Sequence, residues 1–180
     1  MSPSKKNKGK IQKNKKPTFW TQRNIIIIAV ILIAIVASYF LFFRNTSNEP
    51  KWVKEGELTF LSKDTRQQLA KIEVEDASNP TERMQGLMYR THMDEDKGMI
   101  FRFDHSDMQS FWMKNTVIPL DIIFIDDKGV INTIHKKTVP YSEKSLPSKQ
   151  KSQFVVEVIG GFCDSHGIKE GDLIEYKLDK

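Results

Sequence analysis

The sequence predicts a mostly β fold: a small antiparallel sandwich or barrel-like domain with one or two short helices, preceded by a single transmembrane helix. Three observations lead to this prediction. Residues 25–43 form an uninterrupted apolar run. Short segments with alternating polar and apolar residues recur from residue 57 onward. Turn-forming stretches, such as DDKG at residues 126–129, separate several of these segments.

The apolar run near the N-terminus reads IIIIAVILIAIVASYFLFF, which is 19 residues without a charge. As a helix it would span roughly 28 Å, close to the ~30 Å hydrocarbon core of a bilayer. Phe19 and Trp20 precede it, where interfacial aromatic residues are expected. The alternative is a cleavable signal peptide, because Ala34 and Ala37 are small, but the apolar part of such a peptide is usually about 7–15 residues long. We therefore expect an uncleaved membrane anchor.

The charges divide the chain into two parts. Nine of the 28 Lys and Arg residues and none of the 23 Asp and Glu residues lie in residues 1–44, so the rest of the chain has a net charge of −4. Residues 1–24 carry +8, which predicts a disordered tail on the cytoplasmic side of the membrane. We expect residues 44–56 to form a linker and residues 57–180 to form a periplasmic or extracellular domain. Because this domain is mildly acidic, the sequence argues against nucleic-acid binding.

The chain has one cysteine, Cys163, so it forms no intramolecular disulfide. A domain of more than about 100 residues can be stabilised by a hydrophobic core alone. The composition fits a bacterial extracytoplasmic domain. Cys163 and His166 have the residue types of a thiol–imidazole nucleophile pair. However, no third orienting group is identifiable, and the neighbouring glycines indicate a structural turn.

The expected elements of the domain are one or two short helices and about eight strands. The helix is expected over residues 80–88, because Asn79 is a suitable N-cap and Glu82 can complete a capping box. Residues 121–125 are apolar on both faces, which predicts a central strand covered on both sides. Residues 137–153 form a long polar connection, of a kind that is usually functional or mobile. The strands are expected at 57–61, 69–75, 98–103, 109–113, 121–126, 130–136, 154–159 and 172–177.

The aromatic segment FWM at residues 111–113, which is followed by the polar residues KNT at 114–116, predicts a ligand site. An aromatic floor with a few convergent polar groups is typical of small-molecule sites. The alternative is that Trp112 packs in a core while Asn115 and Asp121 hold a turn through hydrogen bonds to the backbone. Arg83 is expected to pair with Asp121 or with a carboxylate of the ligand. The candidate ligand-binding residues are Arg83, Trp112, Asn115, Thr116 and Asp121.

Several short motifs of the domain occur in a fixed order. They are RMQGLMYR at 83–90, GMIF at 98–101, FWMKNT at 111–116, PLD at 119–121, FI at 124–125, Glu157, GF at 161–162, and HGIKEGD at 166–172. With this order and spacing, residues 69–178 resemble the domain of unknown function 192 family. The resemblance implies a small, mostly β, sandwich-like fold, and it implies no established activity.

The methionines raise a second functional hypothesis. Six of the seven methionines fall between residues 84 and 113, and thioether ligands select Cu(I). Extracytoplasmic copper handling is therefore an alternative function, although methionines also fill gaps in cores. The candidate ligands are Met88, Met99, Met113 and His92. No HExxH or CxxC metal motif and no phosphate-binding glycine loop is present, so the sequence assigns no cofactor.

The predicted function is that of a non-catalytic, membrane-anchored module that binds a small ligand or an envelope component. A third hypothesis is a hydrolase of envelope polymers, with Asp121 or His166 as the proton-transfer group. The sequence contains no recognisable pair of general acid and general base in support of catalysis.

Overall fold

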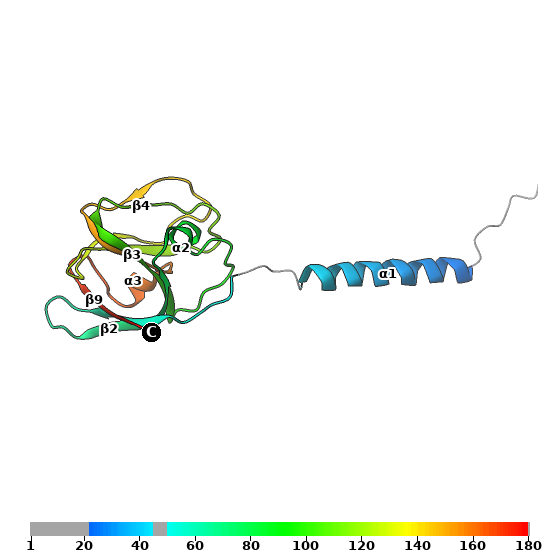
Figure 1. Cartoon of the computed structure of the whole chain (residues 1–180). Coiled ribbons are helices and arrows are strands. Elements are labelled where there is room, and N and C mark those ends of the chain that lie inside the picture. Colours follow the sequence, from blue (N-terminus) through cyan, green and yellow to red (C-terminus); the bar gives the residue numbers. More distant parts are fainter. Residues whose placement is uncertain (1–21, 45–49, 180) are drawn as a thin grey trace, which may run out of the picture. The chain divides into compact units, whose positions relative to one another are not determined.

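The computed structural model describes residues 22–44 and 50–179 (Figure 1). The chain divides into two compact units, Met1–Asn48 and Glu49–Lys180. The sequence predicts a basic tail at residues 1–24. Residues 1–21 of this tail lie outside the described residues.

The described part of the first unit is one helix, α1, which runs from Gln22 to Arg44. Its segment Arg23–Leu41 has a mean hydropathy of 2.8, and none of that segment is buried in the protein. The helix is therefore long and apolar enough to cross a membrane. This confirms the apolar helix expected over residues 25–43. A membrane anchor and a signal sequence share these properties.

The described part of the second unit contains nine strands and two short helices, which confirms the mostly β class. Seven strands form one mixed sheet in the order β6-β5-β8-β3-β2-β1-β9, and β4 pairs with β7. The strands are β1 Gly56–Leu61, β2 Gln68–Ala77, β3 Lys97–Asp107, β4 Ser110–Phe111, β5 Leu120–Ile125, β6 Ile131–His135, β7 Leu146–Pro147, β8 Ser152–Ile159 and β9 Leu173–Leu178; the helices are α2 Pro80–Gln85 and α3 Phe162–Ser165.

The two outer strands of the seven-stranded sheet, β6 and β9, meet each other. Val130, just before β6, forms an antiparallel bridge with Leu173 of β9. The N–H of Ile131 donates to the carbonyl of Asp172 at 2.8 Å. The sheet therefore closes on itself as a barrel, through contacts at one end of these two strands.

One strand pair differs from the expected antiparallel arrangement. β2 and β3 are parallel, with Val74 opposite Gly98, whereas the other described strand pairs are antiparallel. The segment 78–96, which carries α2, connects the end of β2 to the start of β3. A parallel pair needs a crossover of this kind, since a hairpin turn reverses the direction of the chain.

The sheet carries apolar residues on both faces, and they form two cores. Ile123 and Ile125 of β5 belong to the core inside the barrel, which we call the barrel core. Ile122 and Phe124 of the same strand belong to the core on the other face, the outer core. All six residues of β5 are buried. This confirms the prediction that the strand is covered on both sides.

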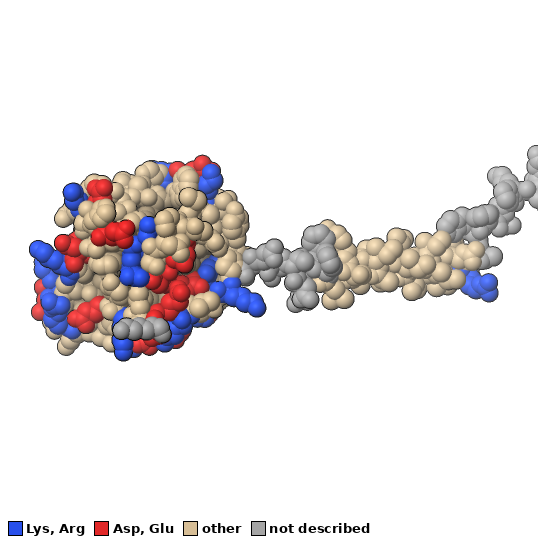
Figure 2. Space-filling model, viewed as in Figure 1, with Lys and Arg blue, Asp and Glu red and all other residues tan. Residues whose placement is uncertain are grey.

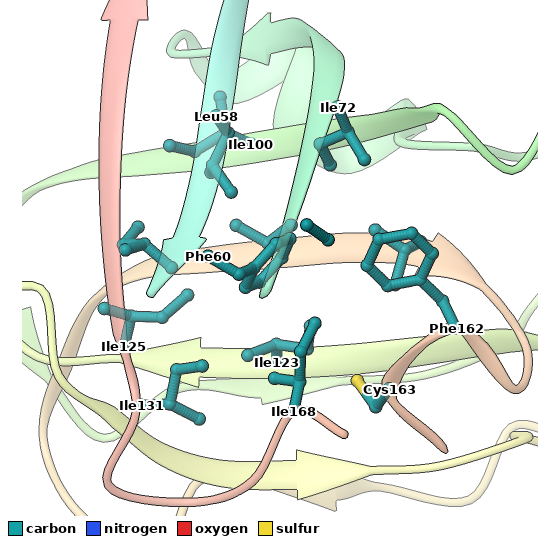
Figure 3. Packing of buried hydrophobic residues seen from close by; sticks show 14 of the residues in the cluster. Leu58, Phe60, Ile72, Ile100, Ile123, Ile125, Ile131, Phe162, Cys163 and Ile168 are labelled. Atoms are coloured by element: carbon teal, nitrogen blue, oxygen red, sulfur yellow. The ribbon is translucent and has the colours of Figure 1, made fainter. Parts of the chain in front are cut away.

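The barrel core is filled by apolar side chains from the strands and from α3 (Figure 3). Phe60 of β1 packs against Phe162 of α3, with ring centroids 5.7 Å apart. Leu58, Phe60 and Ile123 have no exposed surface. Cys163 lies in the same core and is fully buried.

The outer core is covered by β4, β7 and the long connection at residues 137–153. Residues of β4 and β7 pack against it. The N–H of Met113 donates to the carbonyl of Ser142 at 2.8 Å, and the N–H of Tyr141 donates to the carbonyl of Thr116 at 3.1 Å. These bonds hold the long connection against the chain that follows β4.

The helix α2 begins where the sequence predicts and ends earlier. The side chain of Asn79 accepts hydrogen bonds from the N–H groups of Thr81 and Glu82, and the Glu82 side chain accepts from the N–H of Asn79. The predicted capping box is therefore confirmed. The helix ends at Gln85, three residues short of the predicted end, because Gly86 has a φ of +47°.

The linker expected at residues 44–56 is attached to the domain at its C-terminal end. The N–H of Val53 donates to Oε1 of Glu75 at 2.9 Å. Residues 45–49 of this predicted linker lie outside the described residues. The end of the linker is thus part of the folded domain.

Candidate functional site

A cavity of about 350 Å³ lies on the outer-core side of the sheet, lined by residues from α2, β3, β4 and β8. This volume is at the small end of the roughly 300–1,000 Å³ range of ligand pockets. Arg83, Trp112 and Thr116 of the predicted site line the cavity, whereas Asn115 and Asp121 do not. The apolar part of the lining comes from Met84, Leu87, Met88, Phe101, Phe103, Phe111 and Trp112.

Trp112 forms an exposed wall of the cavity. Its neighbour Phe111 packs edge-on against Phe101 and Phe124, with ring centroids 4.9 and 5.7 Å away. Trp112 itself is 47% exposed. The ammonium group of Lys114 lies 5.1 Å from the centroid of its ring. Trp112 is therefore not a core residue, and a large apolar surface beside the cavity is left open to a ligand.

Arg83 projects from α2 and lines the same cavity. Its Nη1 donates to the carbonyls of Ser78 and Arg102, the latter at 2.9 Å, and its guanidinium lies 5.1 Å from the ring centroid of Phe103. Its Nε and Nη2 atoms donate to no group within the described residues. The expected ion pair between Arg83 and Asp121 is wrong, because Asp121 is fully buried elsewhere and bonded to backbone N–H groups.

Glu157 is a buried acid in the lining of the cavity. It lies on β8 opposite Met99 of β3 and Ile122 of β5, and it is only 5% exposed. Among the described residues, no hydrogen bond or ion pair is made by its carboxyl group. Burial raises the pKa of Glu157 to about 8. At neutral pH the carboxyl is therefore mostly protonated and has both an O–H donor and an acceptor to offer.

Gly86 keeps the space above Glu157 open. A Cβ atom at this position would lie 3.2 Å from the Phe101 ring and 3.8 Å from Oε2 of Glu157. The positive φ of +47° also disfavours any other residue here. The end of α2 thus leaves the buried carboxyl accessible from the cavity.

Glu157 was not selected as a site residue from the sequence, although a signal was present. It is the one charged residue in the apolar segment FVVEVI of residues 154–159. Such a strand is buried, and a carboxyl within it is costly unless it is paired or neutral. An isolated acid in a buried strand is therefore a useful marker of a site.

Asp121 does not line the cavity; its carboxylate binds backbone N–H groups. Its carboxylate accepts hydrogen bonds from the N–H groups of Lys137 at 2.7 Å, Gly161 at 3.0 Å and Cys163 at 2.8 Å. The side chain has no exposed surface. These contacts agree with the alternative that Asp121 holds the backbone through hydrogen bonds and does not bind a ligand.

Asn115 and Thr116 shape the loop next to the cavity. Asn115 has a φ of +56°, and its carbonyl accepts the N–H of Tyr89 at 2.9 Å. Its Nδ2 lies 3.8 Å from the sulfur of Met88. Thr116 is buried and its hydroxyl donates to the carbonyl of Lys114 at 3.3 Å. Asn115 therefore contacts Met88, which lines the cavity, whereas Thr116 lines the cavity directly.

The candidate copper ligands occupy different environments. Met88 lines the cavity, while Met99 and Met113 are buried in the outer core. The His92 side chain is 79% exposed, and its Nε2 lies 2.8 Å from the Asp94 carboxylate. Within residues 22–44 and 50–179, no group of three or more His, Cys, Asp or Glu side chains could hold a metal ion. Copper handling by thioether groups stays a prediction.

The residues named for the nucleophilic and hydrolytic hypotheses lie outside the cavity lining. Burial, and then the nearby Asp121 carboxylate, raise the pKa of the Cys163 thiol, so a reactive thiolate is disfavoured. His166 stacks on Phe162 with ring centroids 4.2 Å apart, and its Nδ1 lies 3.0 Å from the Phe162 carbonyl. The geometry therefore gives no support to catalysis by Cys163, Asp121 or His166.

Comparisons with known proteins place this domain beside structures without an established activity. A family model, domain of unknown function 192 (uncharacterized ACR), matches residues 61–176. A solved structure from Sinorhizobium meliloti 1021, provisionally described as a transcription regulator, is 35% identical with a TM-score of 0.65; the match covers 70% of this chain and 98% of that chain. A protein of unknown function from Novosphingobium aromaticivorans DSM 12444 is 39% identical with a TM-score of 0.62, covering 66% and 83%. No curated protein matched.

Proposed function

This chain belongs to the domain of unknown function 192 family, and from that premise we propose that it is a membrane-anchored module that binds a small ligand in the cavity beside Trp112. The module holds the ligand without transforming it. Its anchor is α1, its N-terminus is cytoplasmic, and its domain lies outside the cytoplasmic membrane.

The observation that carries the proposal is a cavity with open apolar walls and unsatisfied polar groups. Trp112 is 47% exposed, and neither the Nε–Nη2 edge of Arg83 nor the carboxyl of Glu157 has a partner among the described residues. Apolar walls with a few convergent polar groups are the usual construction of small-molecule sites. Binding is favoured over catalysis because Glu157 is the sole carboxyl group among the described lining residues, so a paired general acid and base is missing there.

The membrane location rests on α1 and on the charge distribution. The helix has the length and hydropathy of a membrane span. Residues 1–24 carry +8, and positively charged flanks stay in the cytoplasm. The domain would then lie on the opposite side of the membrane.

Nucleic acid is not the proposed partner, in contrast to the provisional description of the Sinorhizobium protein. Residues 45–180 carry a net charge of −4. Acidic and basic side chains are intermixed on the face of the domain seen in Figure 2. A nucleic-acid site usually requires clustered Lys and Arg residues.

A ligand screen on the full chain in lipid nanodiscs tests the binding function. Hits from a diverse library of small molecules are measured by calorimetry against the wild type, Trp112→Ala and the control Tyr176→Ala. Tyr176 is an aromatic residue on β9 that is 38% exposed and outside the cavity lining. We expect Trp112→Ala to weaken binding at least about tenfold and Tyr176→Ala to leave it unchanged. Binding that is insensitive to Trp112→Ala, or no hit at all, would refute the proposal.

Protease accessibility tests the location. Cells that express the chain with an N-terminal tag are converted to spheroplasts and treated with protease. Before treatment, we expect the tag to be joined to the domain in one intact chain. After treatment, we expect the domain to be digested and the tag to be protected. Protection of the domain in intact spheroplasts would contradict the proposed orientation, and early separation of the tag would indicate a cleaved signal peptide.

A further inference from the structure

We propose, resting on the binding function above, that the ligand is an amino-acid-like zwitterion with an apolar body, whose ammonium group binds Glu157 and whose carboxylate binds Arg83. The inference depends on the two ionisable groups of the cavity lining. They have opposite charge types, share one cavity, and form no ion pair with each other.

The Glu157 end of the cavity fits an ammonium group. The carboxyl is 5% exposed, lies opposite the apolar residues Met99 and Ile122, and has no partner among the described residues. A buried acid without a partner lowers stability, so the position is favourable only if something in the cavity pairs with it. The nearby ring of Phe101 adds an aromatic surface, which also attracts cations.

The Arg83 end fits a carboxylate. Two backbone carbonyls hold Nη1, and the guanidinium lies over the Phe103 ring, so the group is fixed in place. Its Nε–Nη2 edge is left without a partner within the described residues. Two parallel N–H donors match the two oxygens of a carboxylate, which gives a bidentate pair.

Both groups line the cavity beside the end of α2. Arg83 lies in the last turn of α2, and Gly86 is the residue that caps the end of this helix. Gly86 in turn faces Oε2 of Glu157, since a Cβ there would lie 3.8 Å from it. Arg83 and Glu157 therefore present two separate polar groups to one cavity near the end of α2. Trp112, Phe111 and the remaining apolar lining are left for the body of the ligand.

The proton balance of this binding step gives it a signature. Glu157 is protonated before binding at pH 7, because burial raises its pKa to about 8. When the ammonium group enters, the Glu157 O–H bond breaks, the proton goes to solvent, and the carboxylate pairs with the ammonium. Arg83 is the other charged group among the described lining residues. Binding should therefore strengthen by up to about tenfold per pH unit between pH 6 and 8, while releasing one proton.

Three probes with the same apolar body separate the two ends: phenylalanine, phenethylamine, which lacks the carboxylate, and 3-phenylpropionate, which lacks the ammonium. A second set uses leucine, isoamylamine and 4-methylpentanoate. Each is titrated by calorimetry into the full chain in nanodiscs, with empty nanodiscs as the blank and two buffers of different ionisation enthalpy to count protons.

We expect the zwitterion of at least one set to bind at least about tenfold more tightly than both truncated probes, with release of a proton. Glu157→Gln should abolish proton release and remove the advantage over the carboxylate probe, and Arg83→Gln should remove the advantage over the amine. Glu170→Gln, an exposed acid outside the cavity lining, is the matched control and should change neither.

The outcomes separate this inference from the binding function. If a carboxylate probe binds as tightly as its zwitterion and Trp112→Ala still weakens it, the cavity binds ligands but the zwitterion inference is wrong. Absence of binding by both probe sets also overturns the inference, and the library screen then decides the binding function by itself.

Discussion

The barrel core and the outer core lie on opposite faces of the same strands, yet they are completed in different ways. The barrel core is filled by apolar side chains and by Phe162 and Cys163 of α3. The outer core is covered by two-residue strands and a long connection, and it borders a cavity of about 350 Å³ that contains a buried acid. One face is therefore fully packed, and the other leaves a cavity.

A single strand shows how both tasks are combined. On β8, Val156 and Val158 face the barrel core, and Val155 faces the outer core. Glu157 lies between the two inward-facing valines and lines the cavity. Because successive residues of a strand face opposite sides, a polar group on one face leaves the packing of the other face intact.

The largest effect is expected at Asp121, which ties the two regions together. Its carboxylate accepts the N–H of Lys137, in the connection that covers the outer core, and those of Gly161 and Cys163 at the start of α3. Asp121→Ala leaves three donors without an acceptor and should lower the free energy of unfolding by about 4 kcal/mol or more. Urea denaturation measures this, with Asp121→Asn as a milder control that keeps one acceptor oxygen. A loss below about 1 kcal/mol would show that the two regions are not joined here.

The next effect compares an aromatic residue from each region. Phe60→Ala creates a void in the barrel core and should cost about 3–5 kcal/mol of unfolding free energy. Trp112→Ala removes a half-exposed side chain and should cost less than about 1 kcal/mol. Thermal and urea unfolding of both variants give the comparison. Equal losses would mean that the Trp112 wall is part of a core, and the distinction between the two faces would fail.

The pH dependence of stability should come from the cavity side. The pKa of Glu157 is raised from 4.5 to about 8 in the folded protein, so the folded state holds this proton when the unfolded state has lost it. Stability should fall as pH rises from about 4.5 to about 8, by up to about 1.4 kcal/mol per pH unit, and then level off. Glu157→Gln should remove this slope in urea titrations at pH 5, 7 and 8.5. If the slope persists in the variant, Glu157 is not the group responsible.

The smallest effect separates backbone strain from filling of the cavity. Gly86 and Gly167 both have positive φ values, of +47° and +66°. A Cβ at Gly86 would contact the Phe101 ring at 3.2 Å, whereas a Cβ at Gly167 meets nothing within 4 Å. Alanine at either position should cost about 1 kcal/mol through strain. Ligand binding, measured by calorimetry, should weaken in Gly86→Ala alone; a similar loss in Gly167→Ala would mean that the effect is not local.

The sequence predicted the elements of this fold better than their arrangement. Alternation of apolar residues located the longer strands, and the Asn79–Glu82 capping box located the start of α2. These features depend on residues close together in the chain. The parallel pairing of β2 with β3 was not predicted, because a strand with one apolar face has the same pattern in either direction.

The sequence named some of the residues that line the cavity, but not the contacts between distant segments. Arg83, Trp112 and Thr116 line one cavity, as a site formed from separate motifs requires. Asp121 has the residue type of a ligand-binding group, but its three backbone donors come from segments 16 to 42 residues away, which no local pattern specifies. Of the two partners expected for Arg83, Asp121 was wrong on that account, and a ligand carboxylate stays a prediction.

The sequence by itself determined the apolar N-terminal helix, the mostly β class, the capping of α2 and the double-sided burial of β5, because each follows from the spacing of side chains along one segment. The tertiary structure decided that the sheet closes into a barrel, that Asp121 is enclosed, and that Glu157 remains without a partner beside a cavity. Those properties depend on which distant segments meet: the exposure of a group and the presence of a partner are set by its neighbours in space, and a linear pattern does not contain them.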